Sequence, residues 1–100
     1  MADPGGKMAI LQRQADETRV QFLKTEFDTC FTLAGIAEGE LRSGLRENAR
    51  RSIAHAEQGY ATLQRFLSDP KHAGRLTGEQ QRDFRKEMER LRKNLDELKQ

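Results

Sequence analysis

A chain of 100 residues has room for one small domain with a modest hydrophobic core. Hydrophobic residues make up 35% of it and charged residues 34%, with a net charge of +2, a balance typical of amphipathic helices with broad solvated faces. The single cysteine excludes a disulfide framework and favours a reducing compartment, and the sequence has neither an apolar run of about 18 residues nor the core of a signal peptide. We therefore expect a cytoplasmic protein without a membrane span.

No stretch is rich in β-branched and aromatic residues, so nothing predicts a strand. The chain divides into a flexible N-terminal lead-in over residues 1–6 and a single domain over residues 7–100. In this domain we expect three helices, at about 7–42, 44–68 and 78–99.

The first predicted helix, over residues 7–42, follows from an apolar seam in a heptad pattern. This seam consists of Val20, Leu23, Phe27, Cys30, Ala34, Ala37 and Leu41. Four further apolar residues lie on another phase of the helix: Met8, Leu11, Ala15 and Phe22. The N-terminal third should therefore project beyond the domain, fray or pack on a second chain, unless the helix starts only at Asp16, a fair N-cap.

Ser43 and Gly44 break the first helix and can cap the second one, over residues 44–68. The apolar stripe of the second helix consists of Leu45, Ala49, Ser52 or Ile53, Ala56, Tyr60, Leu63 and Leu67. The helix should end at Asp69, because the residue before a proline is disfavoured in the helical region. Residues 71–75 then continue as a loop.

Thr77 and Gln80 have the spacing of a capping box, which predicts the start of the third helix, over residues 78–99. Its apolar stripe consists of Phe84, Met88, Leu91, Leu95 and Leu98. The short linkers favour antiparallel neighbours. The expected fold is therefore all-α, a three-helix antiparallel bundle that runs up, down and up.

Small residues line both sides of the predicted turn between the first two helices. Ala34, Gly35, Ala37 and Gly39 precede the turn, and Ala49, Ser52 and Ala56 follow it. Small side chains let two helix backbones approach each other closely. Because a glycine inside a helix costs about 1 kcal/mol relative to alanine, we expect this close approach to explain Gly35 and Gly39.

The same hairpin carries a family resemblance over about residues 30–60. Ile36 and Ala37, the turn glycine Gly44, and Ala49, Ile53 and Ala56 resemble the tetratricopeptide pattern, with small residues in its first helix and a small–bulky–small order in its second. With a third helix added, the hairpin is also similar to a microtubule-interacting-and-trafficking (MIT) domain. The resemblance implies a TPR-like helical hairpin and an interaction role, although an array of such repeats needs about three of them.

No arrangement of residues predicts catalysis or metal binding. Cys30 lies in the heptad seam, where a buried and inert thiol is expected. His55 and His72 are the only histidines, and they lack the spacing of a metal site. Glu38 and Glu40 are expected on the solvated surface. We therefore expect no enzyme, no cofactor and no metal.

Charge is unevenly distributed, with a net charge of −3 over residues 1–41, +4 over 42–75 and +1 over 76–100. The basic middle region predicts a ridge along the second helix, made of Arg42, Arg46, Arg50 and Arg65. Apolar residues beside the main seam are the other candidates for a partner surface: Phe22, Phe31, Leu33 and Ile36. The third helix covers some of these four in an alternative interpretation.

The sequence as a whole favours a small non-enzymatic module for protein–protein interaction or assembly, with a partner helix or peptide in a groove between two helices. A structural homodimer through the N-terminal part of the first helix is the first alternative. A nucleic-acid accessory protein that uses the basic ridge is the second and least favoured one.

Overall fold

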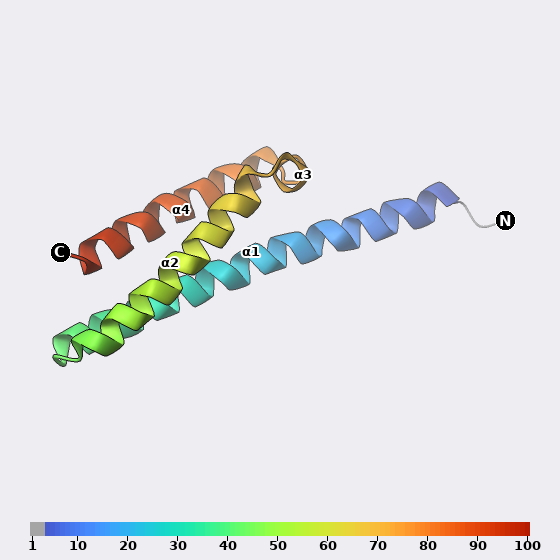
Figure 1. The fold of residues 1–100 in the computed structure, drawn as a ribbon. Helices are drawn as coiled ribbons and strands as arrows, with labels where there is room; N and C mark the ends of the chain where they lie inside the picture. Colours follow the sequence, from blue (N-terminus) through green and yellow to red (C-terminus); the bar gives the residue numbers. More distant parts are fainter. Residues whose placement is uncertain (1–3) are drawn as a thin grey trace.

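The computed structural model describes residues 4–100, and all regular structure within this range is helical (Figure 1). The helices are α1 (Pro4–Arg42), α2 (Arg46–Ser68), α3 (Pro70–Ala73) and α4 (Gly78–Leu98). The all-α class is thus confirmed. No helix in the described range is long and apolar enough to cross a membrane.

The long helix α1 determines the elongated shape of the molecule, which measures 67 × 21 × 17 Å. Its 39 residues span about 58 Å at about 1.5 Å per residue. Figure 1 shows its N-terminal part projecting beyond the other helices. The helix begins at Pro4, three residues earlier than expected, which a proline in the first turn allows. Of the predicted lead-in, residues 4–6 are helical and residues 1–3 lie outside the described range.

The turn between α1 and α2 is made by the end of α1 and not by a cap on α2. Gly44 has a φ of +77°, in the region that favours glycine. The Leu45 amide donates to the Glu40 carbonyl at 2.8 Å and the Gly44 amide to that of Leu41 at 3.1 Å, which is a Schellman motif. The expectation that Ser43 or Gly44 caps the second helix is wrong, because Leu45 is the N-cap residue and makes no side-chain cap bond.

The heptad seam of α1 forms one wall of the core. Leu23, Phe27, Cys30, Ala34 and Ala37 are buried, Val20 is half-buried, and Leu41 is exposed at the turn. In α2, Ala49, Ala56 and Leu63 are buried. Leu45, assigned to the same stripe, is half exposed because it precedes the helix. The alanines of the α1 seam and of the α2 stripe, on the two sides of the turn, are therefore all buried.

Gly35 and Gly39 do not have the packing role that the sequence predicted for them. A Cβ atom at Gly35 or Gly39 would meet no other atom within 4 Å, so close helix approach does not explain either glycine. Gly59 is different, because a Cβ atom there would overlap the sulfur of Cys30 on α1. The close contact between α1 and α2 is thus made at Gly59.

The segment expected as a loop after Pro70 contains the short helix α3 and a core residue. The carboxylate of Asp69 accepts from the Lys71 amide at 2.9 Å, which caps a helix with proline in its first turn. Leu76, just after α3, is buried. The connection between α2 and α4 is thus held by the Asp69 cap and by the buried side chain of Leu76.

Helix α4 closes the core against both longer helices. Its buried residues are Phe84, Leu91 and Leu95. Phe84 stacks on Phe27 of α1, with ring centroids 5.8 Å apart. The capping box at its start is present, since the Gln80 amide donates to the Thr77 hydroxyl and the Thr77 amide to the Gln80 side chain.

Candidate functional site

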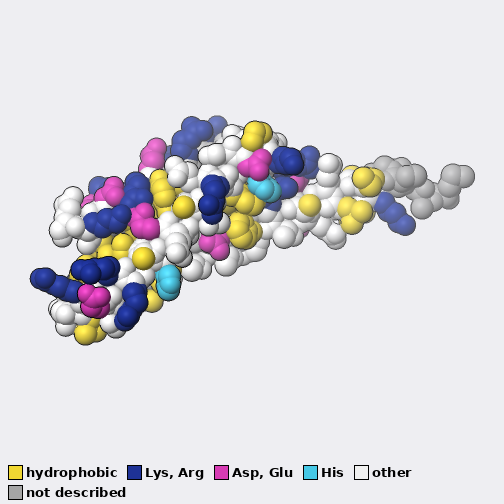
Figure 2. Space-filling view, viewed as in Figure 1, with side chains coloured by type: hydrophobic (Ala, Val, Ile, Leu, Met, Phe, Trp, Pro, Cys, Tyr) yellow, Lys and Arg dark blue, Asp and Glu magenta, His cyan; other side chains and the backbone are white. Residues whose placement is uncertain are grey.

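A groove lies between the first half of α2 and the C-terminal end of α4, with a volume of about 570 Å³. We call it the α2–α4 groove. Its apolar floor consists of Leu41, Ala49, Ile53, Ala54 and Leu98, and its polar rim of Arg46, Arg50, Glu57, Lys99 and Gln100. Figure 2 shows Lys and Arg side chains around apolar atoms at this end of the molecule. The volume falls within the range of about 300–1,000 Å³ that is usual for binding pockets.

The groove is a consequence of small side chains in α2. Ala49 is fully buried against α1, and neither it nor Ala54 extends far enough to fill the space toward α4. Leu98, in the last turn of α4, supplies the floor on the α4 side. Leu41 keeps 39% of its surface exposed here. An apolar floor therefore stays open between two helices.

The charge on the rim is positive at neutral pH. Glu57 carries the one side-chain carboxylate of the rim. It accepts hydrogen bonds from Arg92 and forms an ion pair with Lys99 at 2.7 Å. The Arg92 hydrogen bonds, and next those of Lys99, lower the pKa of Glu57 to about 2, although partial burial opposes the shift. Glu57 is thus already neutralised by these partners. Arg46 makes no ion pair with any residue between 4 and 100 in the structure, and Arg50 pairs only with exposed Glu47.

The four arginines of the predicted basic ridge do not form one continuous surface. Arg46 and Arg50 line the groove. Arg42 lies at the end of α1, where it pairs with Glu38 at 2.6 Å. Arg65 is about four turns from Arg50 along α2 and bonds to Thr62. The structure brings two of the four together.

The four apolar candidates are also divided among different surroundings. Phe31 and Leu33 are half-buried against the core, and the Arg90 guanidinium of α4 lies over the Phe31 ring, 4.5 Å from its centroid. Phe22 is 39% exposed and packs on Phe66 of α2, and Ile36 is 49% exposed. The alternative interpretation, in which the last helix covers some of these four residues, holds for Phe31, because Arg90 of α4 lies over its ring.

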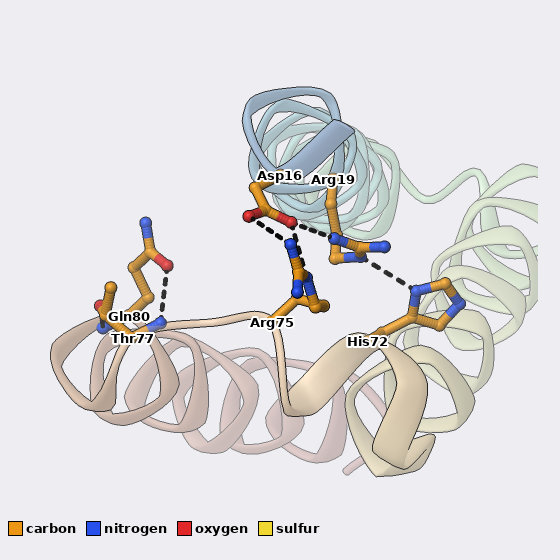
Figure 3. A network of polar contacts seen from close by, with 6 residues as sticks. All are labelled: Asp16, Arg19, His72, Arg75, Thr77 and Gln80. Carbon is orange, nitrogen blue, oxygen red and sulfur yellow. Dashed lines mark hydrogen bonds and ion pairs between the residues drawn. The ribbon is translucent and has the colours of Figure 1, made fainter. Parts of the chain in front are cut away.

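A polar cluster joins α3 and the loop after it to α1 (Figure 3). Arg75 donates two hydrogen bonds to the Asp16 carboxylate, at 3.1 and 3.2 Å, and Arg19 donates a third at 2.8 Å. These bonds, with Arg75 contributing most, lower the pKa of Asp16. Arg19 Nε also donates to Nδ1 of His72 at 3.1 Å, and the imidazole stacks on Phe66. The cluster marks the point at which α1 leaves the packed part of the molecule.

Sequence reasoning missed this cluster and the ion pairs of Glu57. Asp16 and Arg75 are 59 positions apart, and Glu57 and Arg92 are 35 apart. Neither pair belongs to a local motif or a helical repeat, so no periodic signal could have indicated it. In the groove, the uneven charge along the chain indicated Arg46 and Arg50. Four floor residues belonged to three separate predicted stripes, and Ala54 belonged to none.

Cys30 and Glu40 are held in structural contacts. Cys30 is buried, and burial, followed by the charge of Glu26, raises the pKa of its thiol to about 11. Such a thiol stays protonated at neutral pH. Glu40 accepts a hydrogen bond from Ser52 of α2 at 2.6 Å and so links the two helices near their turn. Between residues 4 and 100, no three His, Cys, Asp or Glu side chains come together as a metal site.

Comparison of the chain with protein-family models, with curated proteins and with solved structures finds no match. The resemblance to tetratricopeptide and MIT hairpins therefore stays a prediction from residues 30–60.

Proposed function

We propose that this protein is a small, non-enzymatic interaction module that binds a helix or peptide of a partner protein in the α2–α4 groove. The observation that carries the proposal is an open apolar floor with a basic rim. In this view α1, α2 and α4 act as an up-down-up bundle, with the α1–α2 pair as a TPR-like hairpin. The single cysteine supports a reducing, cytoplasmic compartment.

The groove has the chemistry to bind an acidic amphipathic helix. A helix that docks in a groove inserts apolar residues at positions i, i+3 or i+4 and i+7, and the floor from Leu41 to Leu98 offers apolar surface for them. Arg46, Arg50 and Lys99 would then face the flanks of that helix. Because Glu57 is engaged by Arg92 and Lys99, carboxylates on the partner meet little repulsion.

The separation of the four arginines supports a protein partner over a nucleic acid. A nucleic-acid surface usually combines several basic residues on one face with aromatic residues that stack on bases. Here Arg42 and Arg65 lie apart from the groove, and the floor residues are aliphatic. The nucleic-acid alternative still makes a clear prediction, namely binding that weakens steeply with salt.

Two synthetic peptides of about 18 residues would test the proposal. Both carry leucines at helical spacing, and the flanks carry Glu in one peptide and Lys in the other. Calorimetry should detect binding of the acidic peptide, and Arg46→Glu with Arg50→Glu should lower its affinity at least about tenfold. Arg65→Glu is the matched control on the same helix and should change the affinity less than about twofold.

Amide and methyl NMR shifts locate the binding. The proposal expects shifts at Leu41, Ile53 and Leu98 when the acidic peptide is added. The proposal would be overturned if both peptides bind equally well or if the NMR shifts are confined to other surfaces. Equal effects of the groove variants and the control variant on the affinity would also overturn it. A single-stranded RNA that competes with the peptide, with affinity falling steeply as salt rises, would favour the nucleic-acid alternative.

A further inference from the structure

The outward face of α1 carries a second stripe of side chains at heptad spacing. We call Met8, Leu11, Ala15, Thr18, Phe22 and Thr25 the outer stripe. All six are exposed, and none is charged, although 34% of the chain is charged. A solvated helix face usually carries charged residues, whereas apolar residues at heptad spacing, as at four of these six positions, are typical of a seam between two helices.

The part of α1 that bears the first half of the outer stripe is unsupported. Residues 7–15 are all exposed. Within the described range, Asp16 is the first α1 side chain to bond to another element. An isolated helix of about a dozen residues is marginally stable in water, because helices in proteins depend on packing of an apolar face. The projecting segment therefore needs a surface on which to pack.

We propose that a second copy of this chain occupies the outer stripe, in an antiparallel pair of α1 helices related by a two-fold axis. The axis passes between Asp16 and Glu17. Leu11 then packs on Phe22 of the second copy, Met8 on its Thr25 and Ala15 on its Thr18. Each projecting segment then lies along the part of the other α1 that packs on the remaining helices. The packed helices of the two copies therefore lie at opposite ends of the dimer.

Charge complementarity supports this register. Lys7 and Asp28 occupy the positions that flank the seam, and the register places each Lys7 beside Asp28 of the other copy. Antiparallel helices also align their dipoles favourably. The ring of Phe22 is held by Phe66, 5.1 Å away, so it is already ordered to receive Leu11.

The outer stripe and the α2–α4 groove are separate surfaces. The outer stripe lies on the projecting half of α1, whereas the α2–α4 groove involves α1 only at Leu41. Loss of one interaction therefore leaves the other measurable.

Sedimentation velocity of the full chain, from micromolar to millimolar concentration, tests the pairing. The wild-type chain should pass from one copy to two as the concentration rises. Leu11→Glu should raise the dissociation constant at least about tenfold, since it places a charge in the seam twice. Ile10→Glu is the matched control and should change it less than about twofold, because Ile10 is similarly exposed on the same turn but lies off the stripe.

A charge exchange tests the register. Lys7→Glu should weaken the dimer about threefold to tenfold, because it sets two carboxylates together at two symmetric places. Adding Asp28→Lys should restore the wild-type affinity. The proposal would be overturned if the wild-type chain stays monomeric over the whole concentration range. Equal effects of the substitutions at positions 10 and 11, or failure of Asp28→Lys to restore the affinity, would also overturn it. Circular dichroism verifies that every variant is folded.

Discussion

Cys30 and Gly59 face each other across the interface of α1 and α2, and their small size sets how closely the helices approach there. The sulfur of Cys30 occupies the volume that a side chain at Gly59 would need, and the thiol lies 3.7 Å from the Ala56 carbonyl oxygen. A glycine inside a helix costs about 1 kcal/mol of helix propensity relative to alanine. Close packing offsets this cost at Gly59, whereas nothing comparable is found around Gly35.

We predict that Gly59→Ala lowers the free energy of unfolding by about 1–3 kcal/mol, because its methyl group would overlap Cys30. Gly35→Ala is the control. It adds the same methyl group in open space and should raise the free energy of unfolding by up to about 1 kcal/mol. Urea denaturation measures both values.

The double variant Cys30→Ala with Gly59→Ala tests the cause of this effect. Removing the sulfur makes room for the new methyl group, so the double variant should lose less stability than the two single changes added together. Strict additivity would show that the clash is not the reason.

Three helix boundaries are set by local capping interactions. The left-handed conformation of Gly44 ends α1, the Asp69 carboxylate and Pro70 start α3, and the Thr77 capping box starts α4. These interactions satisfy amides and carbonyls that a helix end leaves without partners. They depend on residues close in sequence and need no contact with a distant segment.

We predict that Thr77→Ala lowers the free energy of unfolding by about 1 kcal/mol, since the Gln80 amide loses its hydroxyl acceptor at 3.0 Å. Thr77→Ser keeps the hydroxyl and should stay within about 0.5 kcal/mol of the wild-type chain. Thermal and urea unfolding measure the difference. Equal losses for alanine and serine would contradict the role of the hydroxyl.

In the whole molecule, a few ionic contacts between distant segments hold the helices in place around the core. Glu57 of α2 bonds to Arg92 of α4 and to Lys99, and Asp16 of α1 bonds to Arg75 after α3. Arg92 also lies over the ring of Tyr60, 4.8 Å from its centroid. The side chain of Glu57 keeps 28% of its surface exposed, so solvent weakens this contribution without removing it.

We predict a loss of stability in acid that depends on Glu57. Its pKa is about 2 in the folded chain, below the ordinary 4.5, so its ion pairs stabilise the fold above the unfolded pKa and are lost as the pH falls toward 2. At pH 7, Glu57→Gln should cost about 1 kcal/mol, and the difference from the wild-type chain should vanish near pH 2. Urea denaturation between pH 7 and pH 2 measures it.

Glu47→Gln is the matched control, because this carboxylate lies on the same helix with 76% of its side chain exposed. It should change the free energy of unfolding by less than about 0.5 kcal/mol at any of these pH values. A Glu57→Gln difference that does not change with pH would contradict the ionic origin.

The sequence alone could predict the all-α class, three long helices, the main seam residues and the capping box at Thr77. All of these depend on helical periodicity or on residues a few positions apart. Departures from the prediction have local causes too: α2 begins at Arg46 and not at 44, because Gly44 and Leu45 complete the Schellman motif that ends α1, and α3 forms where Asp69 offers a cap. Of the groove, the charge pattern indicated only Arg46 and Arg50.

Tertiary structure decided what helical periodicity cannot specify, namely the relative position of distant segments. The α2–α4 groove lies where the last turn of α4 meets a part of α2 that carries alanines. Arg75 binds Asp16 only because α3 returns the chain to α1. The sequence thus determined which side of each helix is apolar and where most helices begin and end, since backbone hydrogen bonding and residue spacing are local. The separation and overlap of the helices depend on how side chains distant in sequence fill a common volume, and only the folded chain defines that volume.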